Sequence, residues 1–239
     1  MAPLALAFTG VLLAAGPPSD AAAIEAAVAR AARQWDADAA VAALAQARTL
    51  ARANPSARAL QLRAGLLAAE LLRVRFEATP PASAPTRQTL GQQIDVIASE
   101  ALDLLPSQPE SSDRERVEAD LVATMIRSDF RARKYQSRFE AAVARARALD
   151  PRNPRALVTA AKPFLFAPPE HGRDLQAGIE LLDQALALDP RLEAALLLRA
   201  FARDQLGDRP AAEADWRAAL RLNPDCAPAR QAMARPRDS

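Results

Sequence analysis

Apolar side chains recur three or four residues apart along most of the chain, which is the spacing of one face of an α-helix. Residues 191–224 show this most clearly. An apolar stripe around Leu196 breaks at Gly207, a second stripe with Trp216 follows, and Pro224 ends it. The stretch predicts two antiparallel helices joined by a short turn. They can approach closely at three small residues, Ala200, Ala212 and Ala219.

The same spacing predicts further helices. They are expected at about residues 21–33, 38–53, 56–77, 86–105, 112–134, 139–149, 154–161, 175–188 and 227–234. Ser112 and Ser137 are each followed three residues later by Glu, the spacing of a capping box, and are expected to start two of these helices. The chain has only 7 Gly, and its 19 Pro fall largely between the helical stretches. We therefore expect an all-α protein of about ten helices.

Residues 191–224 also resemble a tetratricopeptide repeat. The resemblance rests on the small residue Ala200, the turn at Gly207-Asp208, Ala212, the aromatic Trp216, Ala219 and Pro224. Arg203 departs from the family pattern, which usually has an aromatic residue there. The resemblance implies a helical-hairpin solenoid, a superhelix of stacked helix pairs whose first helices line a concave surface.

Internal repetition extends the resemblance along the chain. Pro190 and Pro224 are 224 − 190 = 34 residues apart, whereas Pro151 and Pro190 are 190 − 151 = 39 apart. We place the five extra residues in the loop expected at 162–172. The string ALQLRA at 59–64 nearly repeats ALLLRA at 195–200. We divide the chain into degenerate repeats at 22–105 and clearer repeats with a capping helix at 112–239. Whether residues 86–134 form a degenerate repeat or an inserted hairpin stays open.

The N-terminus has a different pattern. Residues 4–15 (LALAFTGVLLAA) form an apolar run with the length of a signal-peptide core, and this run is too short to span a bilayer. Small residues follow, so we interpret residues 1–21 as a signal peptide, although no positive charge precedes the run. The expected location is the periplasm or cell envelope. The alternative is a packed N-terminal helix in a cytoplasmic protein.

Charge and chemistry exclude several classes of function. Lys and Arg total 31 against 29 Asp and Glu, a net charge of +2, so no nucleic-acid partner is expected. His171 and Cys226 are the only His and Cys, and the motifs CxxC, GxGxxG and GxxxxGK are absent from the sequence. We therefore expect a protein that is not an enzyme and has no cofactor or metal. Acidic pairs such as Glu115 and Glu118 are interpreted as solvated helix faces.

A basic stripe offers one candidate docking surface. Arg127, Arg131, Lys134 and Arg138 are four, three and four residues apart, and on one continuous helix they would share a face. Such a stripe could bind an acidic peptide or lipid headgroups. The other interpretation is a solvated face near a helix end. Contact with a membrane surface has no other support in the sequence.

The tetratricopeptide resemblance implies a more specific binding site. The positions that would line its groove are Ala194, Leu197, Phe201, Asp204 and Gln205, with Arg155, Val158 and Lys162 from the preceding unit. We therefore expect a protein–protein interaction scaffold that binds a protein or peptide. The alternative is a carrier of a small molecule or lipid, with an apolar pocket under residues 162–172. The sequence does not identify the partner, the pathway or the oligomeric state.

Overall fold

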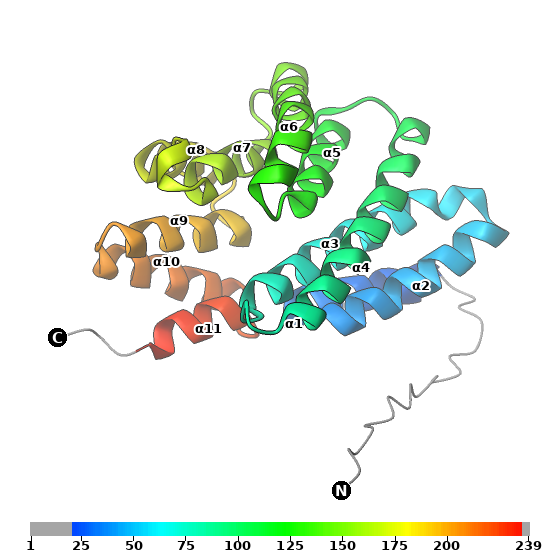
Figure 1. The fold of residues 1–239 in the computed structure, drawn as a ribbon, viewed down its shortest axis with the longest axis horizontal. Coiled ribbons are helices and arrows are strands. Elements are labelled where there is room, and N and C mark those ends of the chain that lie inside the picture. Colours follow the sequence, from blue (N-terminus) through cyan, green and yellow to red (C-terminus); the bar gives the residue numbers. More distant parts are fainter. Residues whose placement is uncertain (1–20, 236–239) are drawn as a thin grey trace, which may run out of the picture.

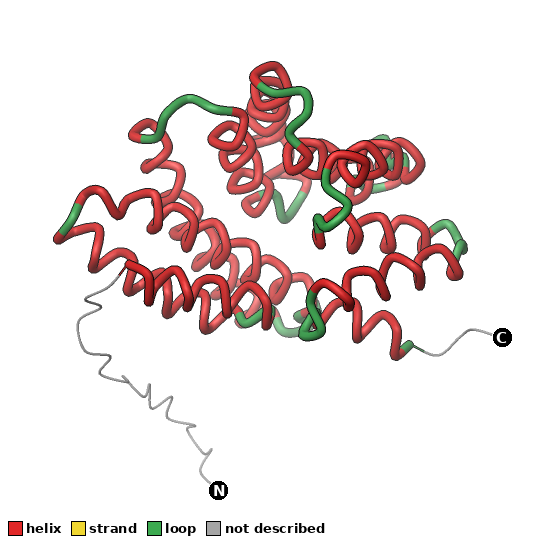
Figure 2. The backbone as a smooth tube through the Cα atoms, turned by 180° about the vertical axis from the view of Figure 1, so that it is seen from behind, coloured by secondary structure: helices red, strands yellow, loops and turns green. Residues whose placement is uncertain are grey.

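The computed structural model describes residues 21–235, which fold into eleven α-helices and three short 3-10 turns with no strand (Figure 1). The first six helices are α1 (Ala21–Gln34), α2 (Ala37–Ala53), α3 (Arg58–Ala78), α4 (Ala84–Leu104), α5 (Ser112–Met125) and α6 (Asp129–Leu149). The remaining five are α7 (Pro154–Phe166), α8 (Leu175–Leu188), α9 (Glu193–Gln205), α10 (Arg209–Leu222) and α11 (Ala227–Ala234). Short turns join consecutive helices into antiparallel hairpins (Figure 2). The predicted all-α solenoid of helix pairs is confirmed. The predicted signal peptide lies outside the described residues, apart from its last position.

An Asn-Pro or Asp-Pro step ends each of the helices α2, α6, α8 and α10 in the same way. The side-chain oxygen accepts a hydrogen bond from the backbone N–H two residues later, and the proline between them has no N–H to continue the helix. The distances are 3.1 Å at Asn54, 2.9 Å at Asp150, 3.0 Å at Asp189 and 3.0 Å at Asn223. The next helix begins three residues after each proline, which gives α3, α7, α9 and α11 a common register.

This register identifies equivalent positions in different helices. Ten residues after the proline stands a small buried residue, Gly65 in α3, Ala161 in α7 and Ala200 in α9. A Cβ on Gly65 would lie 3.2 Å from the Cβ of Ala101, so α3 and α4 approach closely here. The similar strings at 59–64 and 195–200 are therefore out of register by one residue. Gly65, and not Ala64, is the counterpart of Ala200.

Two predicted helix caps, at Ser112 and Ser137, are wrong, although α5 begins at residue 112 as expected. Ser111, not Ser112, caps α5 by accepting a hydrogen bond from the N–H of Arg114 at 3.1 Å, while Ser112 is buried and accepts one from Asn153 Nδ2 at 2.9 Å. The helix predicted at 112–134 ends at Met125, and α6 restarts under a cap from Ser128 and continues through 135–138. The capping-box spacing favours Ser112, because Arg114 and not Glu stands three residues after Ser111. In the structure Glu115 is buried and accepts a hydrogen bond from Arg145, so it does not complete the box.

The interruption predicted at 162–172 is also misplaced. Helix α7 continues through Phe166 with Pro163 inside it, and it has 13 residues, as does α9. The connection that follows, at 167–174, has eight residues against three at 206–208, so the five extra residues lie in this connection. Asp174 caps α8 by accepting a hydrogen bond from the N–H of Ala177 at 3.0 Å.

The helices form an inner and an outer layer. Each helix packs on the next one along the chain, and α1, α3, α5 and α7 also pack on the next odd-numbered helix. Within residues 21–235 the backbones of the even-numbered helices lie farther from one another, and these helices meet through long side chains, as in Arg48–Glu100 between α2 and α4 and Arg131–Asp95 between α4 and α6. In a curved stack the elements on the concave side are closer together, so the odd-numbered helices form the inner layer.

The curvature is strong enough that the two ends of the solenoid meet. The Nδ2 of buried Asn223, at the end of α10, donates to the carbonyl oxygen of Arg33 at 3.0 Å. Two groups of buried side chains form the core, one spanning α1–α6 and one spanning α7–α11, and Trp35 packs against both. Trp35 has a φ of 54°, which turns the chain sharply between α1 and α2. Figure 1 shows α1 beside the C-terminal helices.

None of the helices in the described part of the chain is both long enough and apolar enough to span a membrane.

Candidate functional site

The inner layer presents a surface that we call the inner face, made by the accessible side chains of α1, α3, α5, α7 and α9. It has three sections that differ in chemistry. A charged cluster lies in the middle, an apolar cavity lies towards α1, and an aromatic pair lies towards α9.

The middle section is an ionic cluster that joins three helices, and we call it the central cluster. Its members are Glu70 from α3, Arg116 and Asp120 from α5, and Thr159 and Lys162 from α7. Asp120 is its centre. One carboxylate oxygen accepts from Lys162 Nζ at 2.7 Å and Thr159 Oγ1 at 2.9 Å, and the other accepts from Arg116 Nη1 at 2.7 Å.

Glu70 is held more loosely than Asp120. Its carboxylate lies 3.6 Å from Lys162 Nζ, and 39% of its side chain is exposed, against 4% for Asp120. Desolvation by the surrounding protein raises the pKa of Glu70, opposed by the charge of Lys162. For Asp120 the burial is outweighed by Lys162 and Arg116, which lower the pKa. Glu70 is therefore the carboxylate in this cluster that a ligand can reach.

An apolar cavity of about 440 Å³ lies between α1 and α3, and we call it the α1–α3 cavity. Its lining comes from Val28, Ala29 and Ala32 of α1 and from Leu60, Arg63 and Leu67 of α3, with Glu25 at its edge. Arg63 and Glu25 form an ion pair of 2.6 Å across its rim. Arg63, Leu67 and Glu70 are four and three residues apart, so the cavity and the exposed carboxylate lie on the same side of α3.

The predicted groove residues lie at the other end of the inner face, and their exposure differs. Arg155, Ala194 and Gln205 are exposed, and Leu197 and Phe201 are half-buried. Phe201 packs against Phe166 with ring centroids 5.3 Å apart. Val158 is buried in the core and cannot be reached by a ligand. Lys162 is paired with Asp120, and Asp204 accepts a hydrogen bond from Arg209 at 3.0 Å. No observation tests the groove as a binding site, and it remains a prediction.

The space under residues 162–172 is filled by a side chain. Leu165 is buried and packs directly on Gly178 of α8, where an added Cβ would lie 2.4 Å from Leu165 Cδ2. Phe164 and Phe166 remain partly exposed on either side. This packing leaves no room between Leu165 and α8 for the ligand of a carrier.

The basic stripe does not form. Arg127 lies between α5 and α6 and, together with Arg131, binds Asp95 of α4 at 2.8 and 2.6 Å. Arg138 pairs with Glu118 at 2.8 Å. Three of the four cations are therefore neutralised by carboxylates of neighbouring helices.

The single Cys and His do not form a reactive pair. Burial raises the pKa of the Cys226 thiol to about 11, so the thiol stays protonated near neutral pH, and His171 is exposed in the connection after α7. Among residues 21–235, no three His, Cys, Asp or Glu side chains gather in a way that could hold a metal ion.

Sequence reasoning found one member of the central cluster, Lys162, and missed Glu70 and Asp120. Eleven residues after the preceding proline stand Leu66, Lys162 and Phe201, so the proline register places inner-face residues in α3 as well as in α7 and α9. The count from Pro55 gives Leu66, which is next to Leu67 of the α1–α3 cavity. The same count from Pro109, which lies three residues before the start of α5, gives Asp120, although Gln108 and not Asn or Asp precedes this proline.

No protein-family model matches the chain, and no curated protein matches it. Among solved structures the chain is similar to YrrB, described as a TPR protein with an unusual peptide-binding site. The two share 14% sequence identity with a TM-score of 0.41, and the alignment covers 88% of this chain and 97% of YrrB.

Proposed function

We propose that this chain is a non-catalytic scaffold that binds a protein or peptide segment along its inner face. The observation that carries the proposal is the α1–α3 cavity with the accessible carboxylate of Glu70 on the same side of α3. An apolar pocket beside a polar group is a common form of peptide-binding surface, since the pocket supplies affinity and the polar group fixes orientation.

The geometry defines the partner in chemical terms. The cavity accepts an apolar side chain, because five of its seven lining residues are Val, Ala or Leu. Glu70 lies three residues after Leu67, which is a rise of about 4.5 Å along α3. A segment that places an apolar side chain in the cavity can therefore present a neighbouring Lys, Arg or amide N–H to Glu70. The helices that carry both features are packed on each other, so binding needs little rearrangement.

Site-specific photo-cross-linking in the source cells tests this proposal. A photoreactive residue at Ala29, an exposed position that lines the cavity, is expected to give an adduct with a partner. The matched control is Val96, which is 56% exposed on the outer helix α4 and should give none. Adding Leu67→Asp should abolish the Ala29 adduct, with circular dichroism used to verify that the helices remain. Equal adducts from both positions, or an Ala29 adduct that survives Leu67→Asp, would contradict the proposal.

A second variant distinguishes binding at the groove predicted between α7 and α9 from binding at the α1–α3 cavity. Phe201→Asp alters the aromatic end of the inner face and leaves the α1–α3 cavity unchanged. Loss of the Ala29 adduct with this variant would mean that the partner extends along the whole inner face. Retention would confine the partner to the N-terminal section.

We also propose that the protein is exported to the periplasm or cell envelope. The apolar run at residues 4–15 and the small residues after it support this location. Intact-mass measurement of the protein from fractionated cells tests it. A mature form that begins near Ala21 in the envelope fraction is expected, whereas a full-length form in the cytoplasmic fraction would overturn the proposal.

A further inference from the structure

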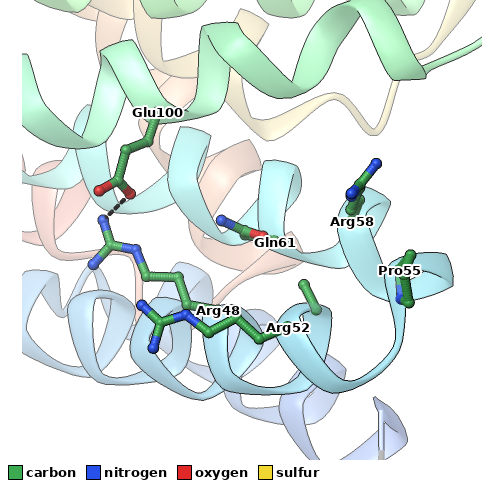
Figure 3. A pocket seen from close by; sticks show the side chains of 7 residues that line it. Arg48, Arg52, Pro55, Arg58, Gln61 and Glu100 are labelled. Carbon is green, nitrogen blue, oxygen red and sulfur yellow. Dashed lines mark hydrogen bonds and ion pairs between the residues drawn. The ribbon is translucent and has the colours of Figure 1, made fainter.

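A second cavity, of about 340 Å³, lies on the opposite side of α3 from the α1–α3 cavity, between α2, α3 and α4 (Figure 3). We call it the arginine pocket. It is lined by Arg48, Ala51 and Arg52 of α2, by Pro55, Arg58 and Gln61 at the start of α3, and by Glu100 of α4. Gln61 and Leu67 are six residues apart, which places them on different sides of the helix.

The proline register shows that α3 differs from α7 and α9 at this pocket. Six residues after the preceding proline, α7 has Leu157 and α9 has Leu196, and both are buried. The same position in α3 is Gln61, which is only partly buried and points into the pocket (Figure 3). An amide therefore occupies the place where α7 and α9 put an apolar side chain into the core. The change costs buried apolar area and leaves a polar cavity.

The charges around the pocket are unbalanced. Arg48 and Arg52 are four residues apart on α2 and share a face, an arrangement that destabilises a helix through like-charge repulsion. Glu100 binds Arg48 Nη2 and is the single carboxylate in the lining. Arg52 and Arg58 form no ion pair within residues 21–235, although many arginines elsewhere in this chain are paired. The pocket thus holds three guanidinium groups against one carboxylate.

One further donor lacks an acceptor. The Nε–H of Arg48 is buried and has no hydrogen-bond partner in the described part of the chain, while its Nη2 is held by Glu100. Buried donors without acceptors are rare in folded proteins because each loses its hydrogen bonds to water. An oxygen-rich anion in the pocket would supply an acceptor and would offset the repulsion between Arg48 and Arg52.

We propose that the arginine pocket binds a small oxyanion with at least two negative charges, carried on phosphate or carboxylate groups. Arg52 and Arg58 each carry a planar guanidinium group, which can donate two parallel N–H hydrogen bonds to two oxygens of such an anion. The Gln61 amide adds a neutral donor. Because the pocket lies across α3 from the inner face, this proposal does not depend on the scaffold function.

Calorimetric titration with two probes tests the proposal and separates the two chemistries. Pyrophosphate carries phosphate groups and citrate carries carboxylates, and each is titrated against sodium chloride at equal ionic strength. Saturable binding of either probe is expected, and the tighter one identifies the ligand class. Binding of neither above the chloride control would overturn the proposal.

Three variants locate the binding. Arg52→Gln and Arg58→Gln each remove one charge-assisted contact from an exposed side chain, and each is expected to raise the dissociation constant about tenfold. Arg147→Gln removes an exposed arginine on α6, outside the lining, and should leave it unchanged. A similar loss with Arg147→Gln would show unspecific attraction to positive charge and would overturn the assignment to this pocket.

A variant that fills the pocket shows whether lost anion binding comes from the pocket and not from loss of the fold. Gln61→Leu restores the residue type found at the equivalent positions of α7 and α9, and it should abolish anion binding while raising the melting temperature measured without anion. Undiminished binding to this variant would mean that the anion binds elsewhere.

Discussion

The central cluster and a second ionic network each hold three helices together, in different ways. The second network joins α8, α9 and α10 through Asp183, Arg199, Arg203 and Asp215, and we call it the C-terminal network. Asp215 is only 6% exposed, and both of its oxygens are bound by arginines at 2.6 to 2.9 Å. The network crosses from the inner layer to the outer layer, whereas the central cluster runs along the inner layer.

The two networks differ in whether they hold a carboxylate that solvent can reach. Arg203 stands where a tetratricopeptide repeat usually has an aromatic residue, and its pairing with Asp215 replaces that packing with charge. Both networks have one nearly buried aspartate. The central cluster adds Glu70, which is 3.6 Å from its cation and has 39% of its side chain exposed. Similar ion pairs can therefore be closed to solvent in one region and leave an accessible carboxylate in another.

The largest expected effect comes from breaking the central cluster. Asp120→Ala should lower the free energy of unfolding by about 3 to 5 kcal/mol, because it leaves Lys162 and Arg116 desolvated without their main partner. Urea unfolding followed by circular dichroism measures this. Asp113→Ala is the matched control, since it removes the more exposed carboxylate of Arg116 and should cost much less. Equal losses would show that Asp120 is not the centre of the cluster.

A smaller effect is expected in the C-terminal network. Asp215→Ala should cost about 2 to 3 kcal/mol, the range for removing hydrogen bonds to charged groups. Arg199 would keep Asp183 at 2.6 Å, and so less uncompensated charge remains than in Asp120→Ala. The same urea measurement ranks the two variants. A greater loss for Asp215→Ala would reverse the comparison and make the C-terminal network the stronger tie.

The smallest effect is the pH dependence of Glu70→Gln. The pKa of Glu70 is raised in the folded state, so the folded protein holds the proton of this carboxyl group more tightly than the unfolded chain does. Stability therefore falls as the pH rises above 4.5, the ordinary pKa of a glutamate side chain. The glutamine cannot ionise. Glu70→Gln should therefore match the wild type below pH 4.5 and exceed its stability towards neutral pH, by less than about 1 kcal/mol because solvent screens the partly exposed group.

Urea unfolding at a series of pH values checks this difference. The Asp120 contribution has the opposite sign, since a lowered pKa gives stability above the ordinary value of 3.8 that is lost as the pH falls. A wild type that is more stable than Glu70→Gln at neutral pH would mean that Glu70 is a structural member of the cluster after all.

Much of the fold could be predicted from the sequence because its signals are local. The steps at Asn54, Asp150, Asp189 and Asn223 end helices through their own side chains and the following proline, so the pattern needs no tertiary context. The sequence analysis places the break at 135–138, whereas the chain turns at 126–128, where the packing of α6 on α5 requires it.

The candidate site was harder to predict because its parts come from helices far apart in sequence. Lys162 could be placed on the inner face from the resemblance, but its partners Glu70 and Asp120 are 92 and 42 residues away (162 − 70 and 162 − 120). The sequence shows only that each is an acid on a helix. Val158 was placed in the groove for the same reason that Lys162 was, and the packing of α7 buried it.

The meeting of α1 with the end of α10 has a consequence for how this solenoid can evolve and melt. In an open array the terminal repeats have one neighbour each, so they fray first, and repeats can be added or lost with little disturbance. Here the contacts of Asn223 and Trp35 give both terminal pairs a second neighbour. The number of helix pairs is then fixed by the requirement that the ends meet, and a chain one pair longer or shorter would be a different shape.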